Sequence, residues 1–324
     1  MERTLRTMLH SEQGGVCCVL ASAILFGVMP FLVQDACLHG GNAVTVACFR
    51  FTFSCLLCLP FLQAAHAPIM LPRSKLWQVL GLSLLYAATL ILLFSSYGSV
   101  GAGVATTLHY IYPIVVLLLS CLLFHARLTV RHVFCLAICA LGVLLLAGPE
   151  SHEGFAAWGA VMAGASGLTY ALYMVLLAHS ELRQVPTLTM TFWLSSFAAL
   201  EIGIYAALTG ALSLHMTWRG WVEEACLGLF CTVFALVLFQ KGLFLCGELK
   251  ASLCSNVEPL TVVIIGMLAF QEPLSLSLGA GIACILTATA INALPSPQRR
   301  SRAGQMPKAM RRQLCWRTKR QPWL

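Results

Sequence analysis

Two stretches of the chain align without a gap at a shift of 146 residues: GAGVATTLHYIYPIVVLLLSCLLF (101–124) and GELKASLCSNVEPLTVVIIGMLAF (247–270). The match continues beyond them, with Leu128 over Leu274 and Ala137 over Ala283. A second match, at a shift of 144, sets residues 21–24 over residues 165–168. The identical positions within the first pair include Gly101 and Gly247, Ala105 and Ala251, Pro113 and Pro259, Leu122 and Leu268, and Phe124 and Phe270. The sequence therefore indicates an internal duplication of nearly half the chain.

The composition predicts a membrane protein. Of 324 residues, 59% are hydrophobic and only 10% are charged, and the mean hydropathy is +0.84. Soluble domains are about 45–50% apolar and about 25% charged. A chain this apolar has too little polar surface for water, whereas lipid solvates an apolar exterior, and each helical crossing takes about 20 apolar residues.

The apolar runs predict an all-α integral membrane protein with ten transmembrane helices, arranged as two inverted five-helix repeats. The repeats are expected at 14–148 and 155–294, between a cytoplasmic tail at 1–13 and a basic, disordered cytoplasmic tail at 295–324. Five crossings is an odd number, so the second repeat must be inverted, and such repeats are typical of alternating access around a site near the midplane. The predicted spans are 14–34, 43–63, 76–97, 104–124, 130–148, 155–178, 187–209, 221–245, 250–270 and 275–294.

The lysines and arginines predict the orientation. Nearly all of them fall in segments that share a side with the N-terminus, and Arg219 is the exception in the loops of the opposite side. Positive charge accumulates on the cytoplasmic side, so both termini are expected there. We expect the plasma (inner) membrane, although short loops leave an organelle membrane open. The basic tail either rests on anionic lipid headgroups or only fixes the topology.

Several classes of function find no support in the sequence. The net charge of +8 comes largely from the C-terminal tail, so nucleic acid is not an expected partner. No phosphate-binding glycine loop, zinc-protease helix motif or serine nucleophile elbow occurs, so neither an enzyme nor a cofactor is expected. Cys135 and Cys139 lie four residues apart without an acidic or histidine neighbour, and we assign no metal.

Short motifs in a fixed order resemble the EamA-type transporters of the drug/metabolite transporter superfamily. They are Ala21–Gly27, Cys48–Phe51, and the pair Asn256-Val-Glu-Pro-Leu260 and Phe270-Gln-Glu-Pro-Leu-Ser275. The first half departs from this pattern, since Tyr112 stands where the second half has Glu258 and Ala126 where it has Glu272. The resemblance, over about residues 14–294, implies a carrier of small organic metabolites.

Glu258 is the first candidate for binding substrate or a coupled proton. It lies well inside a predicted span beside Asn256, and Pro259 should disturb the helix there, as Pro113 should in the paired span. A charge at membrane depth costs at least about 2.5–3.5 kcal/mol, so it should face protein or water. The alternative is a carboxylate whose ion pair or hydrogen bond only shapes the helix.

Three further charges lie inside predicted spans. Lys241 either extends to the cytoplasmic headgroups, which we favour, or turns inward to bind an anionic group or Glu258. Arg50 and Glu201 fall at similar depths and are expected as a buried structural pair, with a substrate contact as the alternative.

Aromatic residues are candidates for lining a cavity, although aromatic residues in spans more often serve as packing or interfacial anchors. Tyr170 and Tyr173 share one helix face. His109, near a span end, is expected to be exposed to water. The candidates for lining a cavity are Tyr86, His109, Tyr110, Tyr112, Tyr170, Tyr173 and Trp193, with water exposure the simpler interpretation of His109.

The sequence and the resemblance together predict a carrier of an amino acid, an amine or a drug-like solute, with export favoured by the resemblance alone. The expected partners are a small-molecule substrate, the lipid bilayer and a possible second copy of the chain. The alternatives are a nucleotide-sugar or phosphate-ester exchanger, for which only Arg50 and Lys241 supply positive charge, a membrane-embedded enzyme, and a scaffold or sensor that transports nothing.

Overall fold

A computed structural model describes residues 11–100, 102–126, 129–147, 157–270 and 276–293. Within these ranges every regular element is helical and no strand occurs. The expected basic tail at 295–324 lies outside the described residues, as does most of the N-terminal tail. The first described helix begins at Glu12, where the Ser11 hydroxyl accepts a hydrogen bond from the Gly14 amide.

The described helices fall into two series of similar order. The first series is α2 (Glu12–Leu38), α3 (Ala43–Ala64), α4 (Arg73–Val100), α5 (Ala102–His109), α6 (Tyr112–Phe124) and α7 (Val130–Ala147). The second series is α8 (Ala157–His179), η1 (Glu181–Gln184), α9 (Thr187–Thr209), α10 (Trp218–Gly228), η2 (Leu229–Phe234), α11 (Ala235–Cys246), α12 (Glu248–Ser255), α13 (Val257–Phe270) and α14 (Leu276–Ala293).

Among the described residues, six helical segments are long and apolar enough to cross a membrane on their own. They are Glu12–Leu38, Ala43–Ala64, Arg73–Tyr97, Ala157–His179, Thr187–Thr209 and Trp218–Cys246. The other expected spans correspond to shorter helices, α7 and α14, and to the pairs α5–α6 and α12–α13. The expectation of a multi-pass helical membrane protein therefore holds, whereas the count of ten crossings stays a prediction.

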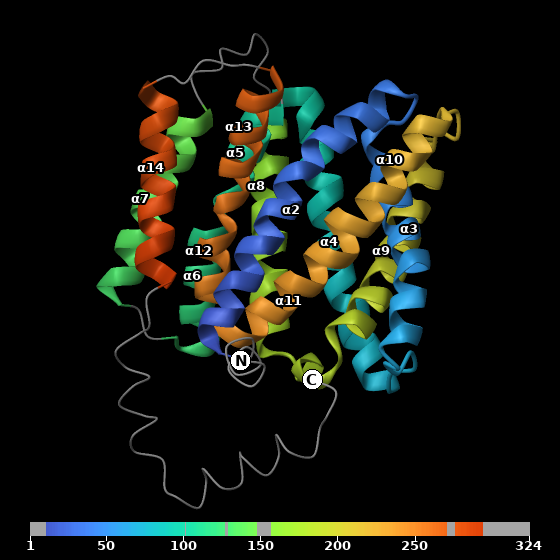
Figure 1. Cartoon of the computed structure of the whole chain (residues 1–324), viewed down its shortest axis with the longest axis horizontal. Coiled ribbons are helices and arrows are strands. Elements are labelled where there is room, and N and C mark those ends of the chain that lie inside the picture. Colours follow the sequence, from blue (N-terminus) through green and yellow to red (C-terminus); the bar gives the residue numbers. More distant parts are fainter. Residues whose placement is uncertain (1–10, 101, 127–128, 148–156, 271–275, 294–324) are drawn as a thin grey trace, which may run out of the picture.

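The helices of the first series pack against those of the second in the same way as the second pack against the first. Helix α2 packs against α11 and α13, and its counterpart α8 packs against the matching helices α4 and α6. Helix α3 packs against its own counterpart α9, and α7 packs against its own counterpart α14. Figure 1 shows these last two pairs at opposite edges of a side-by-side bundle. The packing thus follows the internal duplication read from the sequence.

Two of the expected spans, 104–124 and 250–270, are interrupted near their middle. Helix α5 ends at His109 and α12 ends at Ser255. These residues stand four positions before Pro113 and Pro259, whose rings lack an N–H group and clash with the carbonyl of residue i−4. The backbone closes instead with tighter turns, in which the Ile111 amide donates to Leu108 O at 3.2 Å and the Asn256 amide to Leu253 O at 3.3 Å.

The start of α2 and the end of α14 lie at the same end of the bundle. Lys250 Nζ is 2.6 Å from Glu12 Oε1, and the Asn292 amide group donates to the Lys250 carbonyl at 3.3 Å. These contacts bring the first turn of α2, α12 and the last turn of α14 together, on the lower side of Figure 1.

Candidate functional site

The two helix interruptions meet in the middle of the bundle. The hydroxyl group of Tyr110, which lies between α5 and α6, interacts with the carboxyl group of Glu258. The Tyr112 hydroxyl group donates to the Ser252 carbonyl of α12 at 3.4 Å. The two interruptions, which the duplication predicts to be equivalent, therefore lie next to one another in the bundle.

Glu258 occupies the first turn of α13, directly after the interruption. The first turn of a helix carries unsatisfied amide groups and the positive end of its dipole, which favours a carboxylate there. The side chain is only half-buried, although it belongs to the interrupted middle of an apolar segment. The position therefore favours a carboxylate that keeps some exposure.

Aromatic rings surround this carboxylate and join four helical segments. The Tyr112 and Tyr170 ring centroids are 4.9 Å apart, and those of Tyr86 and Tyr173 are 5.0 Å apart. The His109 ring centroid lies 5.5 Å from that of Tyr112 and 5.6 Å from that of Tyr170. His109 is therefore part of the cluster, whereas the sequence led us to expect it in water. Such rings offer π-faces to a cation or to a flat organic group.

Arg50 is the cation nearest to the cluster. It is 1% exposed, and its guanidinium carbon lies 4.7 Å from the centroid of the Phe51 ring, which in turn packs edge-on against Tyr86. One guanidinium nitrogen contacts the sulfur of Met29, while Nε has no hydrogen-bond partner. The charge of Arg50 acts on the Glu258 carboxyl group. The site thus combines one carboxylate, aromatic faces and one buried guanidinium.

Glu224, in α10, is a buried charge that the sequence reasoning missed. The residue is fully buried, and neither of its carboxyl oxygens has a hydrogen-bond partner among the described residues. Because Glu223 and Arg219 lie close to it in the sequence, we interpreted this segment as the polar end of a span. The sequence does contain a signal for the burial of Glu224. Gly228 lies one helical turn later on the same face, and a glycine there indicates the closely packed side of the helix.

The other sequence-predicted residues lie apart from Glu258. Lys241 is half-buried near Cys18 and forms no ion pair with Glu258. Arg50 and Glu201 form no ion pair either, and the Glu201 carboxylate instead accepts a hydrogen bond from the Ser83 hydroxyl at 2.7 Å.

Trp193 and Asn256 occupy different surroundings. The Trp193 indole N–H donates to the Ile69 carbonyl at 2.7 Å, and its ring packs with Phe192 and Phe197 outside the tyrosine cluster. Asn256, in the α12–α13 interruption, is 2% exposed, and its side-chain oxygen has no partner. Asn256 therefore belongs to the interrupted region, whereas Trp193 does not.

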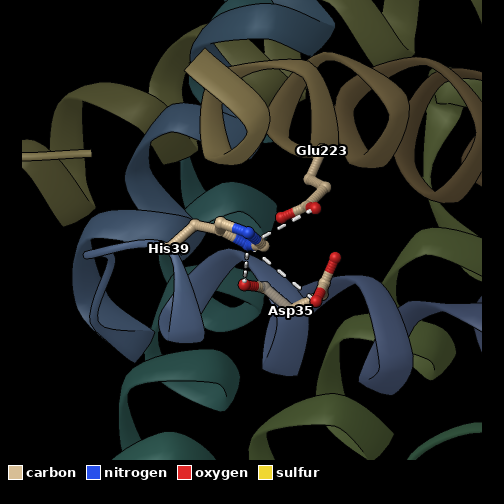
Figure 2. A group of neighbouring side chains, drawn as sticks. All are labelled: Asp35, His39 and Glu223. Carbon is tan, nitrogen blue, oxygen red and sulfur yellow. Dashed lines mark hydrogen bonds and ion pairs between the residues drawn. The ribbon is translucent and has the colours of Figure 1, made fainter. Parts of the chain in front are cut away.

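A separate group of charged side chains joins the end of α2 to the start of α10. His39 Nδ1 lies 3.9 Å from an Asp35 carboxylate oxygen and 3.7 Å from Glu223 Oε1, as Figure 2 shows. One imidazole and two carboxylates are donors that suit a divalent cation. The Asp35 side chain is 53% exposed and the His39 ring already contacts the Asp35 backbone carbonyl at 2.9 Å, so we interpret the group as an ion-pair cluster and assign no metal.

These observations define the class of protein. A bundle of apolar helices, built from two matching series with paired interruptions that meet at its centre, is the architecture of secondary transporters. The interruptions bring a carboxylate and aromatic side chains together at the place where such proteins hold their substrate.

Comparison with known proteins gives the family. The sequence model of the EamA-like transporter family matches twice, at residues 13–148 and 157–294. An uncharacterized transporter of Archaeoglobus fulgidus is 27% identical over 278 residues, which cover 86% of this chain and 95% of the relative. An uncharacterized transporter of Synechocystis sp. is 26% identical over 207 residues, which cover 63% of this chain and 62% of the relative.

A solved crystal structure of another protein has the same fold. It superposes with a TM-score of 0.75 at 18% sequence identity, over 88% of this chain and 99% of that one. The chain belongs to the EamA-like transporter family, as the residues quoted for the resemblance predicted, and it is a membrane transporter.

Proposed function

We propose that this transporter carries small organic solutes with a cationic amino group, such as amines or amino acids, by alternating access. Glu258 binds the amino group, and Tyr110, Tyr112 and Tyr170 surround the organic part of the solute. The single observation that carries the proposal is the half-buried carboxylate of Glu258 beside the aromatic cluster.

A carboxylate and π-faces together favour a cation. An ammonium group gains charge-assisted hydrogen bonds from a carboxylate, and aromatic rings within about 6 Å of their centroids add cation–π attraction. A phosphate ester needs several cationic groups in its site. Arg50 is fully buried behind Phe51, and Lys241 lies away from Glu258. A nucleotide-sugar exchanger is therefore the less favoured function.

The membrane arrangement belongs to the same proposal. We propose ten crossings, with each interrupted pair of helices forming one span, and both termini on the cytoplasmic side of the plasma (inner) membrane. In alternating access, the contact between α6 and α12 at one end of the bundle would open. A contact between α5 and α13 at the other end would then form. In the described residues α12 packs against α6, whereas α5 and α13 are not a packed pair. Export is the direction that the family resemblance favours.

Counterflow in proteoliposomes tests the proposal. Purified protein is reconstituted and given a pooled set of labelled amines, amino acids and nucleotide sugars, and the wild type is compared with Glu258→Gln. We expect saturable exchange of amino-bearing solutes that falls at least about tenfold in the variant, because a buried charge pair is lost.

Glu201→Gln is the matched control. Glu201 is also half-buried and accepts a hydrogen bond from Ser83, but it lies apart from the aromatic cluster. It should leave the exchange unchanged. Exchange restricted to nucleotide sugars, or exchange of amines that survives Glu258→Gln in folded protein, would contradict the proposal.

A further inference from the structure

Close packing of α10 on α3 determines where Glu224 lies. A Cβ atom at Gly228 would stand 2.7 Å from Phe53 Cβ and 2.9 Å from the Ser54 amide nitrogen, so the two helices touch there. Glu224 precedes Gly228 by four residues and shares its face of α10. The carboxyl group of Glu224 is therefore held inside the protein against α3.

No hydrogen bond compensates this carboxyl group. Glu224 is 0% exposed, and neither of its side-chain oxygens has a hydrogen-bond partner in the part of the chain that the structure describes. An isolated ionised carboxylate in such surroundings loses far more hydration free energy than a neutral carboxylic acid does. The group must be neutral or be balanced by a nearby cation.

Arg50 is the cation that can balance it. Arg50 lies on the part of α3 that α10 touches, because a Cβ atom at Gly228 would stand 3.1 Å from the Arg50 carbonyl oxygen. The charge of Arg50 acts on Glu224 and also on Glu258, and Arg50 forms no ion pair with either residue in this structure. The other titratable groups around Glu224 and Arg50 come from α10 itself and from four packed elements: Glu223 of α10, Cys37 of α2, Cys48 of α3, Tyr86 of α4 and Cys231 of η2. Among these neighbours only Arg50 supplies positive charge.

We infer that Glu224 is a proton-binding site, linked by Arg50 to the affinity of Glu258 for a cationic substrate. This inference rests on the proposed function for its substrate, while the proton site itself rests on the burial of Glu224 alone. The ligand is a proton, bound and released at a Glu224 carboxyl oxygen. No covalent bond other than O–H forms or breaks.

The linkage follows from one guanidinium shared between two carboxyl groups. With Glu224 ionised, the buried negative charge attracts Arg50, and Glu258 is free to pair with the substrate amine. With Glu224 protonated, Arg50 neutralises Glu258, and the substrate must compete with it. Proton and cationic substrate therefore oppose each other, and by reciprocity substrate binding promotes release of the proton. This antagonism is what exchange of a proton for a cation requires.

Infrared spectroscopy of purified protein in lipid tests the proton site without any substrate. The wild type should show the carbonyl band of a protonated carboxyl group near neutral pH, and Glu224→Gln should lose it. Glu223→Gln makes the same chemical change one residue away and should keep the band. Equal spectra for Glu224→Gln and Glu223→Gln in this region would overturn the inference.

Binding of labelled tyramine, a primary aromatic amine, tests the linkage. We expect the wild-type affinity to fall about tenfold between about pH 8 and about pH 6, a change typical of coupled sites. Glu224→Gln, permanently neutral, should bind weakly at both values, and Glu223→Gln should follow the wild type. A Glu224→Gln variant with wild-type pH dependence would overturn the inference.

The infrared and the binding experiments distinguish a failure of this inference from a failure of the proposed function. Folded wild type without saturable tyramine binding would count against the proposed function, while the infrared comparison would still decide whether Glu224 holds a proton. Thermal unfolding of each variant in the same detergent shows whether it is folded. Glutamine has nearly the shape of the protonated glutamate side chain, so it fits the buried position.

Discussion

Lys250 Nζ lies 2.6 Å from Glu12 Oε1, and this ion pair fastens the first turn of α2 to the first half of an interrupted helix. The Lys250 side chain is 9% exposed and that of Glu12 is 21% exposed. The pair therefore lies largely out of water, where the partner that remains after a substitution is costly.

We predict that Glu12→Gln lowers the free energy of unfolding by about 2 kcal/mol, less than the about 3–5 kcal/mol of a fully buried pair because Glu12 keeps some contact with water. Glu12→Gln combined with Lys250→Met should recover part of the loss, since the largely buried charge of Lys250 is removed together with that of Glu12. Thermal unfolding of the two single variants and the double variant measures this. Additive losses in the double variant would contradict the coupling.

Close contact between α2 and α11 gives a second prediction about stability. A Cβ atom at Gly242 would lie 2.5 Å from Val19 Cγ2 and 2.7 Å from the Gly15 carbonyl oxygen. Gly242→Ala should therefore destabilise the protein by about 1–3 kcal/mol, because backbone must move. A Cβ atom at Gly81 would have no described atom within 4 Å outside its own helical turns, so Gly81→Ala should be neutral or stabilise by up to about 1 kcal/mol. Similar melting temperatures for the two variants would argue against this packing.

Hydropathy and the internal duplication were sufficient to predict much of the fold. The apolar runs predict the long helices because a span leaves a continuous signal of about 20 residues. The interruptions were only partly predicted. Pro113 and Pro259 indicate a disturbed helix, but the end of α12 at Ser255 and the meeting of Tyr110 with Glu258 depend on how the two halves pack.

The candidate site was less predictable because apolar surroundings hide the partners of a charge. Similar depth led us to expect Arg50 to pair with Glu201, yet depth says nothing about which face of a helix a residue occupies. In the structure Glu201 accepts a hydrogen bond from Ser83, whereas Arg50 stands near Glu224 and Glu258. Glu224 itself was overlooked, since its polar neighbours resemble the end of a span.

Tyr110 provides a test of the site that leaves Glu258 in place. Its hydroxyl group interacts with the Glu258 carboxyl group, which it helps to orient. We predict that Tyr110→Phe weakens binding of a cationic solute about fivefold, the worth of one hydrogen bond. Tyr205→Phe, in α9 outside the aromatic cluster, is the control. Equal affinities for the two variants, measured by binding of labelled amine, would remove Tyr110 from the site.

The interruption before Pro259 provides the last prediction. Replacing Pro259 with alanine supplies an N–H group and removes the ring that clashes with the Ser255 carbonyl, so α12 and α13 can join into one continuous helix. We expect the variant to be at least as stable as the wild type, because an additional backbone hydrogen bond forms. Exchange should nevertheless slow by about tenfold or more, since the rebuilt helix moves Glu258 and stiffens the part of the span that must bend.

Pro60 is the matched control for this substitution, because it lies exposed inside α3 without ending that helix. Pro60→Ala should change neither stability nor exchange by more than a small factor. Counterflow rates and melting temperatures of the two variants, measured side by side, separate a role in transport from a role in folding. A Pro259→Ala variant that exchanges at the wild-type rate would show that the interruption is dispensable, and that the position of Glu258 does not depend on it.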